Sequence, residues 1–144
     1  MSKMSVNEIK EYLAHHNIKA SLPRVKIFEY LITYKTHPTV DEIYNILGTE
    51  LITLSKTTVY NTLNLFVKNN VAIELLIEDN EIRYDADVSN HGHFKCTVCN
   101  KVYDFYYDLS EYNISSLEGF VPIEYHTYIK GICNKCNNKN DWFY

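Results

Sequence analysis

Residues 55–84 read SKTTVYNTLNLFVKNNVAIELLIEDNEIRY, and this stretch decides the fold because its hydrophobic spacing changes halfway. Up to residue 68 the apolar residues recur three and four positions apart, as on a helix that Ser55 can cap: Val59, Leu63, Phe66 and Val67. Asn69 and Asn70 can end that helix, since asparagine tolerates the left-handed conformation. Apolar residues then alternate around an Asp79-Asn80 turn, at Val71, Ile73, Leu75, Ile77, Ile82 and Tyr84. We therefore predict a helix followed by a β-hairpin.

Three more helices are predicted upstream. Ser5 with Glu8, and Thr39 with Glu42, have the spacing of capping boxes, and Pro23 suits the first turn of a helix between them. Apolar residues follow each start at helical spacing: Ile9 and Leu13; Val25, Phe28, Leu31 and Ile32; Ile43, Tyr44 and Leu47. Helices completed by a hairpin form a winged helix-turn-helix. Residues 1–84 are therefore predicted to be a winged-helix DNA-binding domain.

The four cysteines of the chain form two Cys-x-x-Cys pairs, Cys96 with Cys99 and Cys133 with Cys136. Two such pairs supply the four thiolates of a tetrahedral zinc site, and structural zinc is the interpretation we favour. Two disulfides or an iron–sulfur cluster are the alternatives. Nothing at the N-terminus resembles a signal peptide, so we expect a cytoplasmic protein, in which disulfides are rare.

The second half of the chain differs from the first in pattern and in charge. Strands are expected at 93–97, 101–107 and 120–132, with a short helix around 109–118 and a hinge from Asp85 to Gly92. Residues 1–70 carry eight Lys/Arg and six Asp/Glu, whereas residues 71–144 carry six and twelve. An acidic half that holds all the cysteines indicates a separate metal-binding module. We predict an α+β protein whose second domain spans residues 85–144.

The predicted helix from Ser55 is also the candidate for DNA recognition. Most of its surface is polar, with hydroxyl, amide, phenol and ammonium groups at Lys56, Thr57, Thr58, Tyr60, Asn61 and Asn64. Such groups can contact phosphates and base edges, although a polar helix face is usually only solvated. Its position before a wing favours the DNA-binding interpretation.

No apolar run approaches the length of a membrane span.

Several motifs together resemble the Fur family of metal-responsive repressors. They are Thr57-Thr58-Val59-Tyr60, His37-Pro38-Thr39, His91-Gly92-His93 and the two cysteine pairs, in that family's arrangement. The resemblance runs from about residue 6 to Cys136. It implies an N-terminal winged helix that binds operator DNA, a C-terminal α/β dimerisation domain, a homodimer and structural zinc in the four cysteines. It also implies a regulatory metal at the domain junction.

Candidate ligands for that second metal are His37, Asp85, His91, His93 and Asp104. His91 and His93 lie two apart on an extended segment, so they face the same way. Imidazoles with carboxylates suit Fe(II) or Mn(II), and five ligands leave one octahedral position open. Aspartate at both carboxylate positions matches the peroxide-sensing (PerR) branch of the family. In that branch peroxide and Fe(II) oxidise His37 or His91, and the repressor leaves DNA.

Two other interpretations stay open at this point. An iron or manganese uptake regulator would keep every ligand and lack only the oxidation step. A small metalloenzyme would use similar ligands, but the sequence carries no second catalytic group, so we expect no enzyme.

The sequence departs from the family pattern in three places. Possible positions of an additional metal site read Asn90, Gly92 and Tyr125, with only Glu111 retained, so no third site is predicted. The turn before the second helix reads Ser21-Leu22-Pro23-Arg24, in which Arg24 is a candidate for phosphate contact. The basic charge of the first half is weak, which implies a modest non-specific affinity for DNA, with strong salt sensitivity of that binding. The expected DNA-contacting residues are Arg24, Lys56, Thr58, Tyr60 and Asn61.

Overall fold

The computed structural model describes residues 3–78, 81–108, 114–123 and 125–138. The chain divides into two compact units, Met1–Val88 and Ser89–Tyr144. The sequence-based boundary lies between residues 84 and 85, so it assigns Asp85 to Val88 to the second domain. In the structure these four residues belong to the N-terminal unit. The roles assigned to those two domains stay predictions at this stage, and each unit is described separately.

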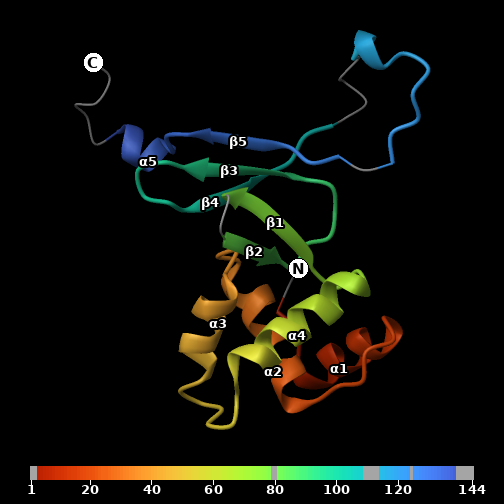
Figure 1. The fold of residues 1–144 in the computed structure, drawn as a ribbon, viewed down its shortest axis with the longest axis vertical. Coiled ribbons are helices and arrows are strands. Elements are labelled where there is room, and N and C mark those ends of the chain that lie inside the picture. Colours follow the sequence, from red (N-terminus) through yellow and green to blue (C-terminus); the bar gives the residue numbers. More distant parts are fainter. Residues whose placement is uncertain (1–2, 79–80, 109–113, 124, 139–144) are drawn as a thin grey trace. The chain divides into compact units, whose positions relative to one another are not determined.

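The N-terminal unit contains four helices followed by a two-stranded antiparallel hairpin (Figure 1). The elements are α1 (Val6–His15), α2 (Leu22–Tyr34), α3 (Val40–Leu47), α4 (Lys56–Lys68), β1 (Ile73–Glu78) and β2 (Glu81–Asp85). One core joins all four helices through fully buried side chains, among them Ile9, Phe28, Ile43, Leu63 and Phe66. The predicted helices and hairpin are confirmed, while the predicted turn at Asp79-Asn80 lies outside the described residues.

The helices begin where the sequence indicates, because a hydroxyl at each start binds an otherwise unpaired backbone N–H. The Oγ atoms of Ser5 and Ser55 accept hydrogen bonds from the N–H groups of Glu8 and Thr58. At the start of α3 the capping box is complete, with Thr39 and Glu42 bonded in both directions. Capping therefore fixes the end of the His37 segment at Thr39 and the start of α4 at Ser55.

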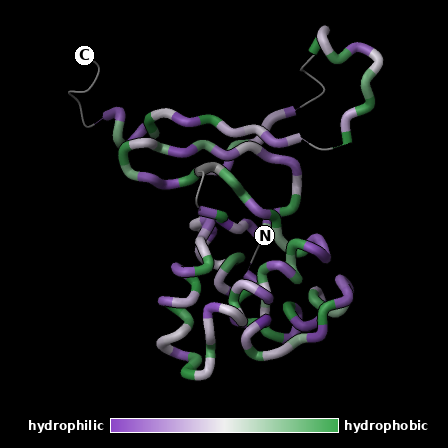
Figure 2. The backbone as a smooth tube through the Cα atoms, viewed as in Figure 1, coloured by the Kyte–Doolittle hydropathy of each residue, from purple (hydrophilic) through white to green (hydrophobic). Residues whose placement is uncertain are grey.

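The C-terminal unit is built on a three-stranded sheet in the order β4-β3-β5 (Figure 1). Its strands are β3 (Gly92–Cys96), β4 (Val102–Phe105) and β5 (Tyr128–Gly131), with a 3-10 turn at η2 (Ser115–Leu117) and a short helix α5 (Asn134–Asn137). Strand β3 pairs antiparallel with β4 and parallel with β5. Figure 2 shows hydrophilic and hydrophobic residues interspersed along these strands.

Two sequence-based expectations for this unit need correction. The strand predicted over 120–132 is confined to Tyr128–Gly131, and the other described residues of that range lie outside strands. Pro122 lacks the N–H that a sheet ladder needs, and Phe120, Val121 and Ile123 are exposed. The helix expected around 109–118 is only the 3-10 turn at Ser115–Leu117 in its described part, while residues 109–113 lie outside the described residues.

The pairing of β3 with β4 sorts the chemically important side chains onto two faces. His93 lies opposite Asp104 across the ladder, and Phe94 lies opposite Tyr103. Because side chains alternate along a strand, His93 and Asp104 share one face, while Phe94, Cys96 and Tyr103 share the other. One face of this sheet therefore carries the candidate metal ligands His93 and Asp104, and the other face carries Cys96.

In the described part of the chain, no helix is both long and apolar enough to span a bilayer.

Candidate metal centres and nucleic-acid interface

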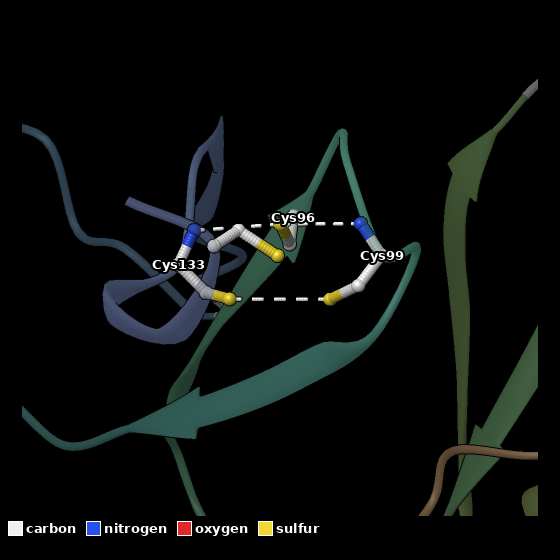
Figure 3. A group of neighbouring side chains, drawn as sticks. Cys96, Cys99 and Cys133 are labelled. Atoms are coloured by element: carbon white, nitrogen blue, oxygen red, sulfur yellow. Dashed lines mark hydrogen bonds between the residues drawn. The ribbon is translucent and has the colours of Figure 1, made fainter. Parts of the chain in front are cut away.

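The four cysteines gather at one end of the three-stranded sheet. Parallel pairing of Cys96 with Gly131 brings the Cys133 turn beside the Cys96 turn. The Sγ atom of Cys96 accepts hydrogen bonds from the backbone N–H groups of Cys99, at 3.5 Å, and Cys133, at 3.4 Å. Figure 3 shows the sulfur atoms of Cys96, Cys99 and Cys133 turned toward one another.

The geometry of this cluster fits a tetrahedral zinc ion. The ligand atoms of all four cysteines lie within 4.8 Å of one another, and the Sγ atoms of Cys99 and Cys133 are 3.9 Å apart. A zinc ion with Zn–S bonds of about 2.3 Å requires sulfur–sulfur distances of about 3.8 Å. All four cysteines are free thiols, so neither of the disulfides considered above is formed.

The four thiols differ in acidity because their surroundings differ. Burial raises the pKa of Cys96, but the backbone N–H groups of Cys133 and Cys99 outweigh burial and lower this pKa to about 6. Burial, together with hydrogen bonding to the neighbouring cysteines, raises the pKa of Cys136 to about 12. The pKa of Cys133 is also lowered, chiefly by the backbone N–H of Cys136. Cys96 and Cys133 therefore lose their protons more readily than an ordinary thiol, and Cys136 must lose its proton when a metal binds.

On the opposite face of the sheet, Asp104 lies beside two histidines. One carboxylate oxygen of Asp104, Oδ1, is 3.4 Å from the Nε2 atoms of both His91 and His93. Both histidines are buried, and their ring centroids are 4.5 Å apart. The Nδ1 atom of His91 lies 2.8 Å from the carbonyl oxygen of Ser89. If Nδ1–H donates to that carbonyl, Nε2 is left as the ligand atom of His91.

A second histidine–carboxylate pair lies in the N-terminal unit. His37 and Asp85 are both buried, and the Nε2 atom of His37 is 3.3 Å from Oδ2 of Asp85. Strand β2 fixes this loop, because Arg83 donates to the carbonyl of His37 and the N–H of Tyr84 donates to that of Pro38. The backbone of His37 has a φ of 54°, in the left-handed region, which is uncommon for residues other than glycine.

The chemistry of both groups fits a divalent metal ion. Cis ligands of an octahedral ion with bonds of about 2.1 Å lie about 3.0 Å apart, close to the 3.3 and 3.4 Å distances within each group. Asp85 is also oriented through its other oxygen, Oδ1, which accepts a hydrogen bond of 2.9 Å from the Asp87 N–H. Such hydrogen bonds to ligands are typical of protein metal sites.

Three of the four residues on α4 that are predicted to contact DNA lie on its exposed side. Val59 and Leu63 are buried, whereas Lys56, Tyr60 and Asn61 are exposed, Tyr60 by 50%. Thr58 is half-buried, and its hydroxyl is engaged with Ser55 in the helix cap. The Nζ atom of Lys56 lies 3.1 Å from an oxygen of Asp41, in an ion pair whose members are both well exposed. Exposed pairs of this kind contribute less than about 1 kcal/mol, so a phosphate can replace Asp41.

A pocket of about 360 Å³ lies between the start of α2 and α4. It is lined by Lys19, Ala20, Ser21, Pro23, Arg24, Thr58, Asn61 and Thr62. The guanidinium of Arg24 donates a hydrogen bond of 2.7 Å to the carbonyl of Lys19, which holds it at this pocket. Of the predicted DNA-contacting residues, Arg24, Thr58 and Asn61 therefore line this pocket, whereas Lys56 and Tyr60 do not.

Sequence reasoning missed three residues that lie beside these sites. Lys19 lines the same pocket as Arg24, Tyr103 packs against the cysteine cluster, and Tyr106 has its ring 5.4 Å from that of His91. Strand alternation next to Asp104 is the signal that could have found Tyr103. The expectation that there is no third metal site stays a prediction, because Glu111 lies outside the described residues.

Comparison with known proteins gives a consistent result. The model of the ferric uptake regulator family matches residues 15–129. The chain is 32% identical to the peroxide operon regulator of Bacillus subtilis, over 98% of this chain and 99% of that protein. It is 33% identical to the peroxide-responsive repressor PerR of Staphylococcus aureus, over 92% of this chain and 94% of the repressor.

A solved structure supports the fold. The Helicobacter pylori ferric uptake regulator matches with a TM-score of 0.75 and 21% identity, covering 95% of this chain and 97% of that one. The predicted α+β architecture, a winged helix followed by an α/β dimerisation domain with a four-cysteine site, is confirmed. Proteins of this family are transcriptional regulators that bind operator DNA as dimers, and they are not enzymes. The chain therefore belongs to the ferric uptake regulator family of metal-responsive repressors.

Proposed function

We propose that this repressor senses hydrogen peroxide through Fe(II)-dependent oxidation of a histidine ligand, His37 or His91. The observation that carries this proposal is the carboxylate pair: Asp85 lies beside His37, and Asp104 lies beside His91 and His93. Aspartate at both positions is the pattern of the peroxide-sensing branch. The names of the Bacillus subtilis and Staphylococcus aureus relatives give independent support.

The proposal includes two metal ions with different roles. A zinc ion bound by Cys96, Cys99, Cys133 and Cys136 is structural, since four thiolates leave no open position. An Fe(II) or Mn(II) ion bound by His37, Asp85, His91, His93 and Asp104 is regulatory, because one octahedral position stays open. As a regulator of operator DNA, the protein would work in the cytoplasm.

When Fe(II) is bound, it supplies the electrons that reduce hydrogen peroxide. The chain's own contribution is to hold imidazole rings within bonding distance of that reaction and to hold them rigidly. The hydrogen-bonding environments of His91 and Asp85 keep ligand atoms in place. Burial of His37, His91 and His93 limits side reactions with bulk solvent. The product would be an imidazole that carries one more oxygen atom and binds the metal poorly.

Loss of a ligand would then affect DNA binding. His37 belongs to the N-terminal unit and Asp104 to the C-terminal unit. A metal that both residues bind would link the two units, and its loss would release that link. Release of a shared ligand is a common way for a local chemical change to alter the geometry of a dimer.

The decisive experiment compares the Fe(II)-loaded and Mn(II)-loaded proteins after mild peroxide. In the Fe(II) form, we expect operator binding to be lost and one added oxygen to appear on the peptide that contains His37 or His91. The Mn(II) form should keep both its mass and its DNA, since Mn(II) reacts poorly with peroxide. Equal resistance of the two forms would contradict peroxide sensing and favour a metal-uptake regulator.

A further inference from the structure

We propose that Tyr103 donates a hydrogen bond from its hydroxyl to the Cys133 thiolate of the zinc-loaded cluster, and that this bond slows oxidation of the cluster. Tyr103 would be a positioning residue, since it acts through a cysteine and does not bind the metal. The inference rests on the zinc assignment of the proposed function and extends it to the durability of the site.

The position of Tyr103 follows from the register of the sheet. Tyr103 lies on β4 opposite Phe94, one residue before Asp104, so it faces the cysteines while Asp104 faces the histidines. Both Tyr103 and Phe94 pack against buried Cys96, Cys133 and Cys136. Of the groups around Tyr103, the Cys133 thiol contributes most to the raised pKa of its hydroxyl, in keeping with this packing.

The buried hydroxyl of Tyr103 also needs a hydrogen-bond acceptor. Its oxygen is completely buried and forms no hydrogen bond of good geometry with the described residues. A buried hydroxyl without a partner costs about 1–3 kcal/mol, so such groups are rare unless another state of the protein supplies the partner. Zinc binding supplies one here, because it converts the neighbouring thiols into thiolates, which accept hydrogen bonds more strongly.

The hydrogen bond would complete the set of donors around the cluster. Four thiolates and one Zn²⁺ leave a net charge of −2, which donors must offset. The Sγ atom of Cys96 already accepts two backbone N–H groups, whereas Tyr103 packs against the cluster that contains Cys133 and brings a further donor to it. Donors outside the ligand set typically change metal affinity by about 10- to 100-fold when they are removed.

The consequence concerns peroxide itself. A thiolate attacks hydrogen peroxide, so that an S–O bond forms and the O–O bond breaks, giving sulfenate and water as sulfur is oxidised and peroxide reduced. A hydrogen bond to the sulfur withdraws the electron pair that makes this attack. A repressor that meets peroxide at one metal site benefits from a zinc cluster that reacts more slowly than its histidines.

The test uses the full-length, zinc-loaded protein with Mn(II) added, and compares it with Tyr103→Phe and Tyr107→Phe. The control also loses one tyrosine hydroxyl, which is bonded to the Thr127 hydroxyl, away from the cysteines. Under fixed peroxide, we expect Tyr103→Phe to release zinc to a coloured chelator about ten-fold faster than the wild type. In Co(II)-substituted protein its sulfur-to-cobalt absorption band should move to lower energy. Tyr107→Phe should match the wild type in both measurements.

Unchanged zinc release and an unchanged cobalt band in Tyr103→Phe would overturn the proposal, as would equal changes in Tyr107→Phe. If Tyr103→Phe does not fold, Tyr103→Leu takes its place, since it also lacks the hydroxyl. A wild-type protein that contains no zinc would instead refute the zinc assignment of the proposed function. Loss of peroxide sensing with a normal Tyr103 effect would refute the regulatory proposal alone.

Discussion

At the scale of single residues, the central feature is one carboxylate shared by two histidines. Asp104 Oδ1 is equally distant, at 3.4 Å, from the Nε2 atoms of His91 and His93. Strong hydrogen bonds between charged partners are shorter, about 2.7–2.9 Å. The longer, equal distances resemble ligands around a common ion more than a pair of salt bridges. The length of the Asp104 side chain should therefore determine the geometry of the metal ligands at the proposed regulatory site.

Asp104→Glu tests this dependence. The substitution adds one methylene to the carboxylate, which should change the position that peroxide would use while a carboxylate still binds the metal. We expect Mn(II)-dependent operator binding to stay within about three-fold of the wild type and histidine oxidation in the Fe(II) form to fall about ten-fold or more. Quantitative mass spectrometry of the histidine peptides measures the second effect. Oxidation at the wild-type rate would show that the side-chain length is irrelevant.

Gly92, between the two histidines, is a second residue whose size matters. A Cβ atom at this position would overlap the ring of Phe105, which is the neighbour of Asp104 on β4. In Gly92→Ala the Phe105 ring must move, at a cost of about 1–3 kcal/mol, and Asp104 should move with its strand. We expect Mn(II) affinity, measured by calorimetry, to fall about ten-fold while the zinc content stays unchanged.

Gly131→Ala is the milder control for that change. Its Cβ would approach the Phe94 ring at 3.1 Å, a contact that small shifts can relieve. Mn(II) affinity should then change little. An equal loss of Mn(II) affinity in both variants would indicate general damage to the sheet rather than displacement of Asp104.

At the scale of elements, α4 separates packing from recognition along a single helix. Its buried residues, Val59, Leu63 and Phe66, hold it in the core, while Tyr60 is 50% exposed on its surface. Tyr60→Ala should therefore weaken operator binding by about 1–3 kcal/mol and leave the thermal midpoint nearly unchanged. Tyr34→Ala is the matched control, since Tyr34 is a similarly exposed tyrosine on α2. Fluorescence anisotropy with operator DNA measures the effect, and a large loss of stability in Tyr60→Ala would refute the recognition role.

The elements of the N-terminal unit could be predicted well from the sequence because their signals are local. Caps such as Thr39–Glu42 and the change of period after Asn70 both act within a few residues. The range 120–132 was predicted poorly, because apolar residues there resemble a strand although only Tyr128–Gly131 pairs with β3. Whether such residues find a partner depends on other parts of the structure, which the local pattern does not specify.

The candidate site shows the same difference between residues that a local sequence pattern reveals and residues whose role depends on the fold. The two cysteine pairs and the His91–His93 pair could be identified from their spacing alone. Asp85 carries no spacing signal and was suggested only by its place in the predicted hinge. His37 is a lone histidine, which is usually a surface residue, and it became a candidate ligand because it matches a ligand position of the family. Tyr103 was missed because its role depends on the register of β4 with β3, which places it opposite Phe94.

At the scale of the whole molecule, the two units have different sources of stability. The N-terminal unit has a large core in which side chains such as Ile27, Phe28 and Phe66 are fully buried. The corresponding buried cluster around the cysteines contains Cys96, Cys133 and Cys136, packed with Phe94 and Tyr103. A cluster this small needs the metal, because thiols contribute little burial and their thiolates repel one another.

Removal of zinc should therefore affect the two units unequally. A structural zinc contributes on the order of 10 kcal/mol to folding, so Cys96→Ser or strong chelation should unfold the C-terminal unit and abolish the dimer. The helices of the N-terminal unit should survive, because its core contains no cysteine. We expect most of the helical circular dichroism to remain, while sedimentation reports monomers and amide exchange becomes fast in β3, β4 and β5. Cys99→Ser should have the same effect. Because Cys99 is exposed and lies outside the buried cluster, this variant removes a zinc ligand without disturbing the packing. A stable, zinc-free dimer of either variant would show that the four cysteines do not form a structural zinc site.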